Sequence, residues 1–242
     1  MRRFFIPSEQ IQDNEAEIRG TDVHHIRDVL RLQAGDTFPA TDGQGNLLTV
    51  RIRKIEDDII VTGIVESTRA GENKVKIRLY QAIPRGNKFD WIIEKACELG
   101  VVEVIPVISE RTISRLSEER GLKKIGRWER IAGETAKQVG RVTSMSIHNA
   151  ISFKDIQKSL LGFSLKLVPW EMEETKSLKL VLQENVSLVD IEVIIGPEGG
   201  FSAQEIDSLR ENGFQSVTLG GQILKSETAA IVTIGNILFS RE

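Results

Sequence analysis

The feature that most constrains the fold is a regular alternation of strand-like and helical patterns that begins at residue 76. Residues 101–108 form a near-continuous apolar run, which is typical of a strand buried on both faces. Gly100 and Gly140 each follow a stripe of apolar residues at helical spacing, at the position where helices commonly end. The alternation predicts a parallel α/β sheet, with strands at 76–83, 101–108, 164–168 and 191–195 and helices at 89–99 and 128–139.

The first seventy residues have a different pattern, in which short strands surround one helix. Residues 47–55 and 59–67 are rich in Val, Ile and Thr and are separated by an acidic turn. Thr21 is expected to cap the helix, whose apolar stripe includes Val23 and Ile26. This pattern indicates a small β-barrel with one helix.

A polar break at residues 69–74, which contains a glycine, separates the two patterns. A chain of 242 residues can form one large domain or two small ones. We therefore expect a β-barrel domain over residues 1–72 and an α/β domain over residues 73–242.

Two glycine-rich segments each follow a strand and precede a helix. The first, at 196–201, ends at Ser202, which has the capping-box spacing with Glu205. The second, at 220–225, ends at Ser226, which is expected to cap an almost wholly apolar helix. Such turns can bind ligands, but neither has the spacing of a P-loop or a dinucleotide fingerprint, and a structural role is as good an explanation. The apolar helix must be buried in the core or against another subunit.

The charge is unevenly distributed along the chain. The net charge is −3, yet residues 73–145 carry 15 basic and 9 acidic side chains. This middle third could hold phosphates, or it could be a solvated helical face. Cys97 is the single cysteine, which excludes an intramolecular disulfide and a cysteine-based zinc site. No apolar run approaches the length of a membrane span, so we expect a cytoplasmic protein that does not bind membranes.

Several motifs occur in order along most of the chain. Residues 195–202 are Ile-Gly-Pro-Glu-Gly-Gly-Phe-Ser, and residues 219–229 are Leu-Gly-Gly-Gln-Ile-Leu-Lys-Ser-Glu-Thr-Ala. Upstream lie Arg3–Phe5, His25–Ile26, Lys88–Asp90, Glu94–Val101, Glu110–Arg111, and Trp128 with Ile131. Together they resemble the RsmE-type small-subunit rRNA uridine-N3 methyltransferases of the SPOUT superfamily.

The resemblance implies a PUA-like β-barrel domain followed by an α/β domain of SPOUT type, with a parallel sheet and a C-terminal trefoil knot. It also implies a homodimer and S-adenosylmethionine as the cofactor. No metal is expected, because a sulfonium already makes its methyl group electrophilic. By the same match, the cofactor site would be lined by Pro169, Ile195, Gly196, Glu198, Gly199, Gly200, Leu219, Gly220, Ile223 and Leu224.

The implied reaction is methylation of N3 of a uridine in the decoding region of the small-subunit rRNA. The N3 proton must leave, so the site must supply a base or stabilise the uridine anion. The catalytic candidates are Lys225, Glu227 and Arg141, although Glu227 could simply favour the start of its helix. The residues expected to contact RNA are Arg2, Arg3, His25, Arg31, Lys88 and Arg111, for which a solvated face, or a packed histidine, is the alternative.

The sequence departs from the family pattern in the second glycine segment. Gly221-Gln222 stands where Pro-Arg is usual, and Lys225-Ser226 stands where Arg-Thr is usual. Lysine keeps the charge of arginine but loses its planar two-pronged donor. Two alternatives therefore stay open: a methyltransferase of the same fold that acts on another RNA, and a catalytically silent RNA-binding or ribosome-assembly factor. The partner in the first reading is small-subunit rRNA or the assembled small ribosomal subunit.

Overall fold

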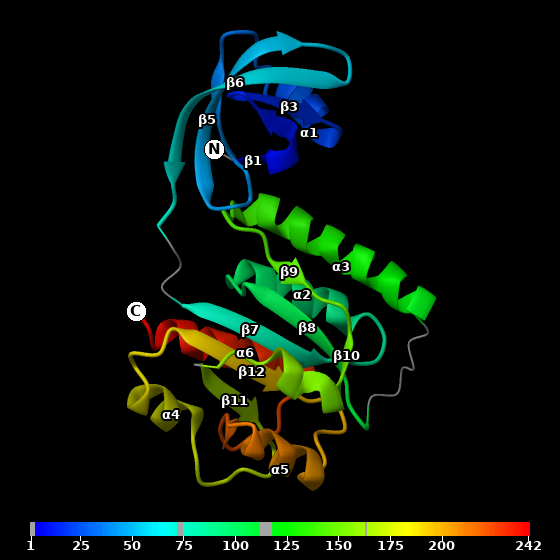
Figure 1. Ribbon diagram of the computed structural model, residues 1–242, viewed down its shortest axis with the longest axis vertical. Coiled ribbons are helices and arrows are strands. Elements are labelled where there is room, and N and C mark those ends of the chain that lie inside the picture. The colour runs from blue at the N-terminus through cyan, green and yellow to red at the C-terminus, as the bar shows by residue number, and fades with distance from the viewer. Residues whose placement is uncertain (1–2, 72–74, 112–117, 163) are drawn as a thin grey trace. The chain divides into compact units, whose positions relative to one another are not determined.

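The computed structural model describes residues 3–71, 75–111, 118–162 and 164–242, and Figure 1 shows the path of the chain. The chain divides into two compact units, one formed by residues 1–72 with 134–144 and the other by residues 73–133 with 145–242. Residues 134–144 lie within the second domain expected from the sequence, but they pack with the first unit.

The first unit contains a six-stranded sheet with the strand order β1-β4-β5-β6-β3-β2. Its strands are β1 (Phe4–Phe5), β2 (Ile11–Gln12), β3 (Glu15–Arg19), β4 (Thr37–Thr41), β5 (Asn46–Ile55) and β6 (Ile59–Arg69). All neighbouring strands are antiparallel except β1 and β4, which are parallel. The pairing of β5 with β6 is interrupted by two register shifts, which bend the sheet around a core that includes Phe4, Ile26 and Phe38. The two strands predicted in this region are confirmed.

The helix of the first unit differs in detail from the prediction. It consists of α1 (Thr21–His24) followed by a π-helical turn, η2 (His25–Val29). Gly20, with a φ of 72°, occupies the N-cap position, and no side chain caps the helix. The prediction that Thr21 is the cap is therefore wrong, because a glycine can adopt the positive φ required before this turn. A short 3₁₀ turn, η1 (Ser8–Gln10), precedes β2.

The second unit is built on a seven-stranded parallel sheet. Six of its strands follow the order β10-β8-β7-β12-β11-β13, and the seventh, β9, pairs with β8. Its strands are β7 (Lys76–Ala82), β8 (Glu103–Ile108), β9 (Ser146–Ile147), β10 (Ile151–Ser152), β11 (Leu165–Pro169), β12 (Asp190–Ile195) and β13 (Gln215–Val217). Every pairing between them is parallel. The predicted parallel α/β sheet is confirmed, and β7 and β12 lie side by side near its centre.

The helices that follow these strands are α2 (Lys88–Glu98), α3 (Glu118–Val139), α4 (Leu178–Glu184), α5 (Ala203–Glu211) and α6 (Ser226–Phe239), with a 3₁₀ helix, η3 (Phe153–Ser159). Helix α2 packs against α6. Helix α5 and η3 pack on the side of the sheet where Tyr80 and Ile194 point. Gly100 and Gly140 have positive φ angles, as expected of residues that end helices.

Helix α6 is apolar nearly all round, but only part of it is buried in this chain. Ala230, Ile234 and Ile237 are fully buried, whereas Phe239 is 78% exposed. The expectation of burial in the core is confirmed for one face. In the described part of the chain, no helix is long and apolar enough to cross a membrane.

Candidate functional site

A cavity of about 880 Å³ lies in the second unit, where three neighbouring strands end. It is lined by the segments that follow β11, β12 and β13, which are adjacent in the sheet order. We call these segments the first loop (170–177), the second loop (196–201) and the third loop (218–225). The carboxyl ends of parallel strands are the usual ligand-binding edge of an α/β sheet, and the volume suits a small molecule.

The structure brings together all ten residues that the resemblance assigned to a cofactor. They line the cavity as a group: Pro169, Ile195, Gly196, Glu198, Gly199, Gly200, Leu219, Gly220, Ile223 and Leu224. The resemblance assigned no individual residue within the first loop, and the cavity is also lined by Trp170, Glu171, Glu173, Glu174, Phe201 and Thr218. A strand at 164–168 was predicted, but the sequence does not show that this strand lies between the other two.

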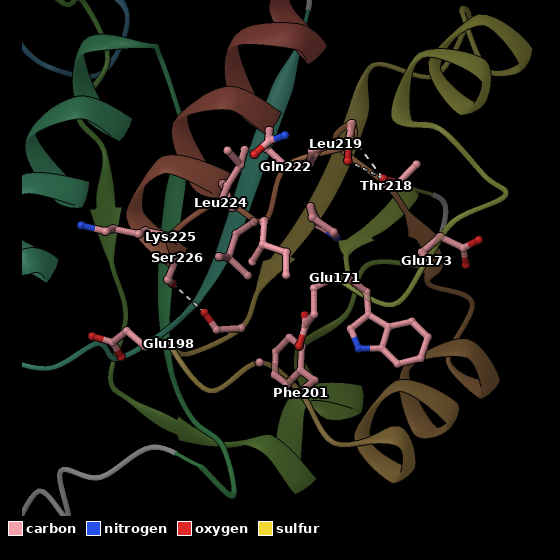
Figure 2. Close-up of a pocket in the computed structure, with 18 of the residues that line it drawn as sticks. Glu171, Glu173, Glu198, Phe201, Thr218, Leu219, Gln222, Leu224, Lys225 and Ser226 are labelled. Atoms are coloured by element: carbon pink, nitrogen blue, oxygen red, sulfur yellow. Dashed lines mark hydrogen bonds between the residues drawn. The ribbon is translucent and has the colours of Figure 1, made fainter.

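Local backbone geometry explains the shape of the second loop. Gly200 has a φ of 66°, and a side chain at this position would overlap the carboxylate of Glu171. Figure 2 shows Glu171 pointing toward Phe201 in the middle of the group. The predicted capping box is confirmed: the Glu205 backbone N–H donates to Ser202 Oγ, and Ser202 N–H donates to Glu205 Oε2. The loop is therefore rigidly joined to α5.

Residues that follow β8 hold the second loop from outside. The Arg111 guanidinium donates a hydrogen bond of 2.5 Å from Nη1 to the Gly199 carbonyl oxygen. The backbone N–H of Glu110 donates to Glu205 Oε1 over 3.0 Å, and Glu205 is itself buried. Arg111 was predicted to contact RNA, which stays a prediction, and the structure shows it bonded to the wall of the cavity.

Ser226 joins the second and third loops. Its hydroxyl donates to the Gly196 carbonyl oxygen over 2.6 Å (dashed in Figure 2) and accepts from Gln81 Nε2 over 3.0 Å. Lys225, not Ser226, occupies the N-cap position of α6, and its side chain makes no capping bond. The prediction that Ser226 caps α6 is therefore wrong, because Ser226 is already the first helical residue and the extended backbone of the N-cap position belongs to Lys225.

The first loop is held by a buried carboxylate. Glu173 accepts hydrogen bonds from the hydroxyls of Ser216 and Thr175 and from the backbone of Thr175 and Lys176. These bonds, that from Ser216 foremost, lower the pKa of Glu173 from 4.5 to about 2 although burial opposes the shift. Glu173 is thus ionised at neutral pH and fixes the loop against β13.

Trp170, the first residue of the first loop, forms another part of the cavity wall. The guanidinium of Arg210 lies 5.3 Å from the centre of the indole ring. The indole Nε1 is buried and has no hydrogen-bond partner among the described residues. A buried donor without a partner is costly, and a bound ligand or water can satisfy it.

Lys88 connects the second loop to the start of α6. Its Nζ lies 3.3 Å from Glu198 Oε1 and 3.4 Å from Glu227 Oε1. Burial acts to lower the pKa of Lys88, but the bonds to the two carboxylates outweigh it and raise that pKa. Burial likewise acts to raise the pKa of Glu198, but hydrogen bonds from its own backbone, from the Arg85 backbone N–H and from Lys88 lower it. Both groups are charged at neutral pH.

The remaining predicted site residues lie in different surroundings. Lys225 lines the cavity, and Figure 2 shows its exposed side chain extending away from Glu171 and Phe201. Glu227 lies in the first turn of α6, and its Oε2 is buried without a hydrogen-bond partner among the described residues. Arg141 belongs to the first unit, where its Nε donates to the Thr143 carbonyl oxygen.

The RNA-contact candidates of the first unit are only partly exposed. Arg3 donates a hydrogen bond to the Gly140 carbonyl oxygen. The ring of His25 packs against Phe4, with centroids 5.8 Å apart, which fits the alternative of a packed histidine. Arg31 is exposed and has a φ of 54°. Arg2 lies outside the described residues. Within those residues, no group of His, Cys, Asp and Glu side chains is arranged to hold a metal ion.

Comparison with known proteins defines the class to which this fold and site belong. A family model described as an RNA methyltransferase domain matches residues 71–238, and a model described as an RNA methyltransferase PUA domain matches residues 18–66. The fold is therefore that of RNA methyltransferases that carry a PUA domain, and the expected combination of a PUA-like β-domain with a parallel α/β domain is confirmed.

Individual relatives narrow the class. The ribosomal RNA small subunit methyltransferase E of Aquifex aeolicus is 33% identical over 240 residues, which cover 96% of this chain and 97% of the relative. The protein of the same name from Bacillus subtilis is 28% identical and covers 100% of this chain and 98% of the relative. The crystal structure of ribosomal RNA small subunit methyltransferase E from Neisseria gonorrhoeae, bound to S-adenosyl methionine, matches with a TM-score of 0.84 and 30% identity, over 99% of this chain and 97% of that one. The chain belongs to the ribosomal RNA small subunit methyltransferase E family.

Proposed function

We propose that the protein transfers a methyl group from S-adenosylmethionine to N3 of a uridine in the decoding region of small-subunit rRNA. The observation that carries the proposal is the cavity at the ends of β11, β12 and β13, which gathers all ten residues assigned from the resemblance. The solved relative from Neisseria gonorrhoeae is bound to the same cofactor.

The residues around the cavity fit this cofactor chemically. S-adenosylmethionine carries a positive sulfonium and an ammonium group, and four carboxylates line the cavity: Glu171, Glu173, Glu174 and Glu198. Ionised carboxylates attract such cations, most strongly where water is partly excluded. Gly220, whose φ is 121°, has no side chain to cover the backbone of the third loop, so a flat adenine ring can approach the amide groups there. The buried indole Nε1 of Trp170 supplies a further donor.

The site must also allow the target base to lose its N3 proton. Uridine N3 becomes a nucleophile only when its proton leaves, and a nearby cation lowers the cost of the resulting anion. Among the cationic candidates, Lys225 lines the cavity, and we assign it the stabilisation of this anion. Glu227 is assigned the orientation of the neighbouring cations through its contact with Lys88. Arg141 stays a second cationic candidate. The cofactor, when bound, supplies the electrophilic methyl group.

The proposal extends to partners. The domain of residues 1–72 would bind rRNA or the assembled small subunit, with Arg3 and Arg31 as contacts. The part of α6 not buried in this chain, which ends at the exposed Phe239, supports a homodimer. We further propose that the C-terminal segment forms the trefoil knot and that the protein acts in the cytoplasm.

The test is to incubate the purified protein with methyl-tritiated S-adenosylmethionine and small ribosomal subunits that lack the modification. Digestion to nucleosides and chromatography then locate the label, and the expected result is label in 3-methyluridine from the small-subunit rRNA. Label in another nucleoside or another RNA would favour a related methyltransferase of different specificity. No transfer and no binding of the cofactor would leave the silent RNA-binding factor.

A further inference from the structure

Gln81 is a polar side chain in an unusual place. It lies near the end of β7, in the apolar centre of the parallel sheet, and is fully buried. Burying an amide costs free energy unless it is hydrogen-bonded, so a glutamine at such a position needs a reason. Glu192, the other buried polar residue of the central strands, has purely structural partners: Tyr80, Ser164 and the backbone of Leu161. Gln81 differs because its partner lines the cavity.

The hydrogen bonds of Gln81 have a fixed direction. Its Nε2 donates to the Ala82 carbonyl oxygen and to Ser226 Oγ, each over 3.0 Å. A carbonyl can only accept, so the amide nitrogen must face Ala82, and Ser226 then receives a donor. The single proton of the Ser226 hydroxyl is thereby left for the Gly196 carbonyl oxygen, which it meets at 2.6 Å. The amide orientation thus determines the bond at the cavity wall.

This chain of bonds links the start of α6 to the second loop and to β7, where Gln81 lies opposite Ile195 in the pairing with β12. Gly196 begins the second loop, and Ser226 directly follows the third loop as the first residue of α6. Gln81 belongs to β7 and bonds to Ser226. The ring of Phe201 lies beside Gly196, at 3.2 Å from where a Cβ on that residue would be. The bond between Ser226 and Gly196 therefore ties the start of α6 to the second loop, and Gln81 fixes the direction of that bond.

We infer that Gln81 is a positioning residue for cofactor binding, which acts through Ser226 to hold the Gly196 carbonyl and the start of α6 at a fixed separation. This inference rests on the proposed function.

The experiment measures the dissociation constant for S-adenosylmethionine by isothermal titration, in the absence of RNA. Gln81→Leu removes both donors at similar size, and Ser226→Ala removes the hydroxyl. Each is expected to weaken binding about tenfold, as the loss of one hydrogen-bonded link would. The double variant should be no weaker than either single variant, because both remove the same chain of bonds. Ser226→Thr keeps the hydroxyl and should bind S-adenosylmethionine with wild-type affinity.

A matched control separates positioning from general stability. Thr62, fully buried in the first unit, donates a comparable hydrogen bond of 3.0 Å to the Ala16 carbonyl oxygen. Thr62→Val should lower the melting temperature as much as Ser226→Ala does and leave the dissociation constant unchanged. Gln81→Glu gives a second test, because its carboxylate would accept the Ser226 proton and release the Gly196 carbonyl.

The outcomes distinguish a failure of the proposed function from a failure of the inference about Gln81. If the wild-type protein does not bind S-adenosylmethionine, the proposed function fails. If the wild type binds but folded Gln81→Leu and Ser226→Ala bind equally well, the inference about Gln81 is overturned while the function stands. Additive losses in the double variant would also overturn it, since the two residues would then act separately.

Discussion

The second and third loops line the same cavity but are held in different ways. The second loop is bonded on every side, through Gly196 to Ser226, through Glu198 to Lys88 and Arg85, and through Gly199 to Arg111. In the third loop the residues from Gly220 to Ile223 are exposed, and Ile223 is 83% exposed. The difference indicates a preformed wall on one side and, on the other, a loop whose side chains acquire their partners when a ligand binds.

The largest expected effect comes from glycines in the two loops. Gly200→Ala puts a side chain on a left-handed residue and against the Glu171 carboxylate, so affinity for S-adenosylmethionine should fall roughly a hundredfold. Gly221→Ala, in the third loop, meets no neighbour and no left-handed backbone, so its affinity should change less than about threefold. Titration of both variants checks this, with circular dichroism to verify folding. Equal losses would remove the distinction between the loops.

The role of Arg111 gives the next effect. Arg111→Ala should weaken cofactor binding about tenfold, because the Gly199 carbonyl loses its donor. The dependence of RNA affinity on salt concentration should keep its slope, since no phosphate contact is lost. Filter binding over a range of salt concentrations measures that slope. A shallower slope with normal cofactor affinity would restore the original expectation that Arg111 binds RNA.

The low pKa of Glu173 in the first loop predicts that the stability of the protein depends on pH. The pKa of Glu173 is about 2 in the folded protein and 4.5 when unperturbed, so its carboxylate stabilises the fold above pH 4.5. This contribution is lost as the pH falls from 4.5 toward 2. Glu173→Gln should therefore be less stable than wild type at pH 7, with the difference narrowing at pH 3. Urea unfolding at both pH values tests it, and a constant difference would contradict the assignment.

The smallest effect on the ligand-free protein is expected at Ile223. Because its side chain is 83% exposed, Ile223→Ala should shift the melting temperature by no more than about 2 °C. The same change should weaken cofactor binding a few-fold, because the side chain is expected to be covered only in the complex. Thermal melts with and without S-adenosylmethionine would show this, and a change without ligand would mean that the third loop is packed beforehand.

The sequence predicted the sheet well because apolar runs and glycine-ended helices are local signals. It found the second and third loops for the same reason, since glycines directly follow a strand. It assigned Pro169, at the end of β11, but no residue within the first loop, because the position of β11 between β12 and β13 depends on strand order, which no local pattern records. Helix α4 was missed, being a single short helix capped by Ser177.

Two residues were wrongly predicted to be helix caps. Thr21 and Ser226 both have the residue type and position of a helix cap, yet Gly20 takes the cap position of α1 and Ser226 bonds to Gly196. A side chain at a helix start can form a local cap or a tertiary bond, and residue type alone does not decide between them. The contact of Arg111 with Gly199 could not be predicted from the sequence for a similar reason, since it depends on the fold.

The central claim is that the cavity at the ends of β11, β12 and β13 is the cofactor site. A crystal structure of the protein grown with S-adenosylmethionine tests it most directly. The account predicts the cofactor in this cavity, against the backbone of the third loop, with Ser226 still bonded to the Gly196 carbonyl. Cofactor bound elsewhere, or a second loop rearranged to admit it, would contradict the account.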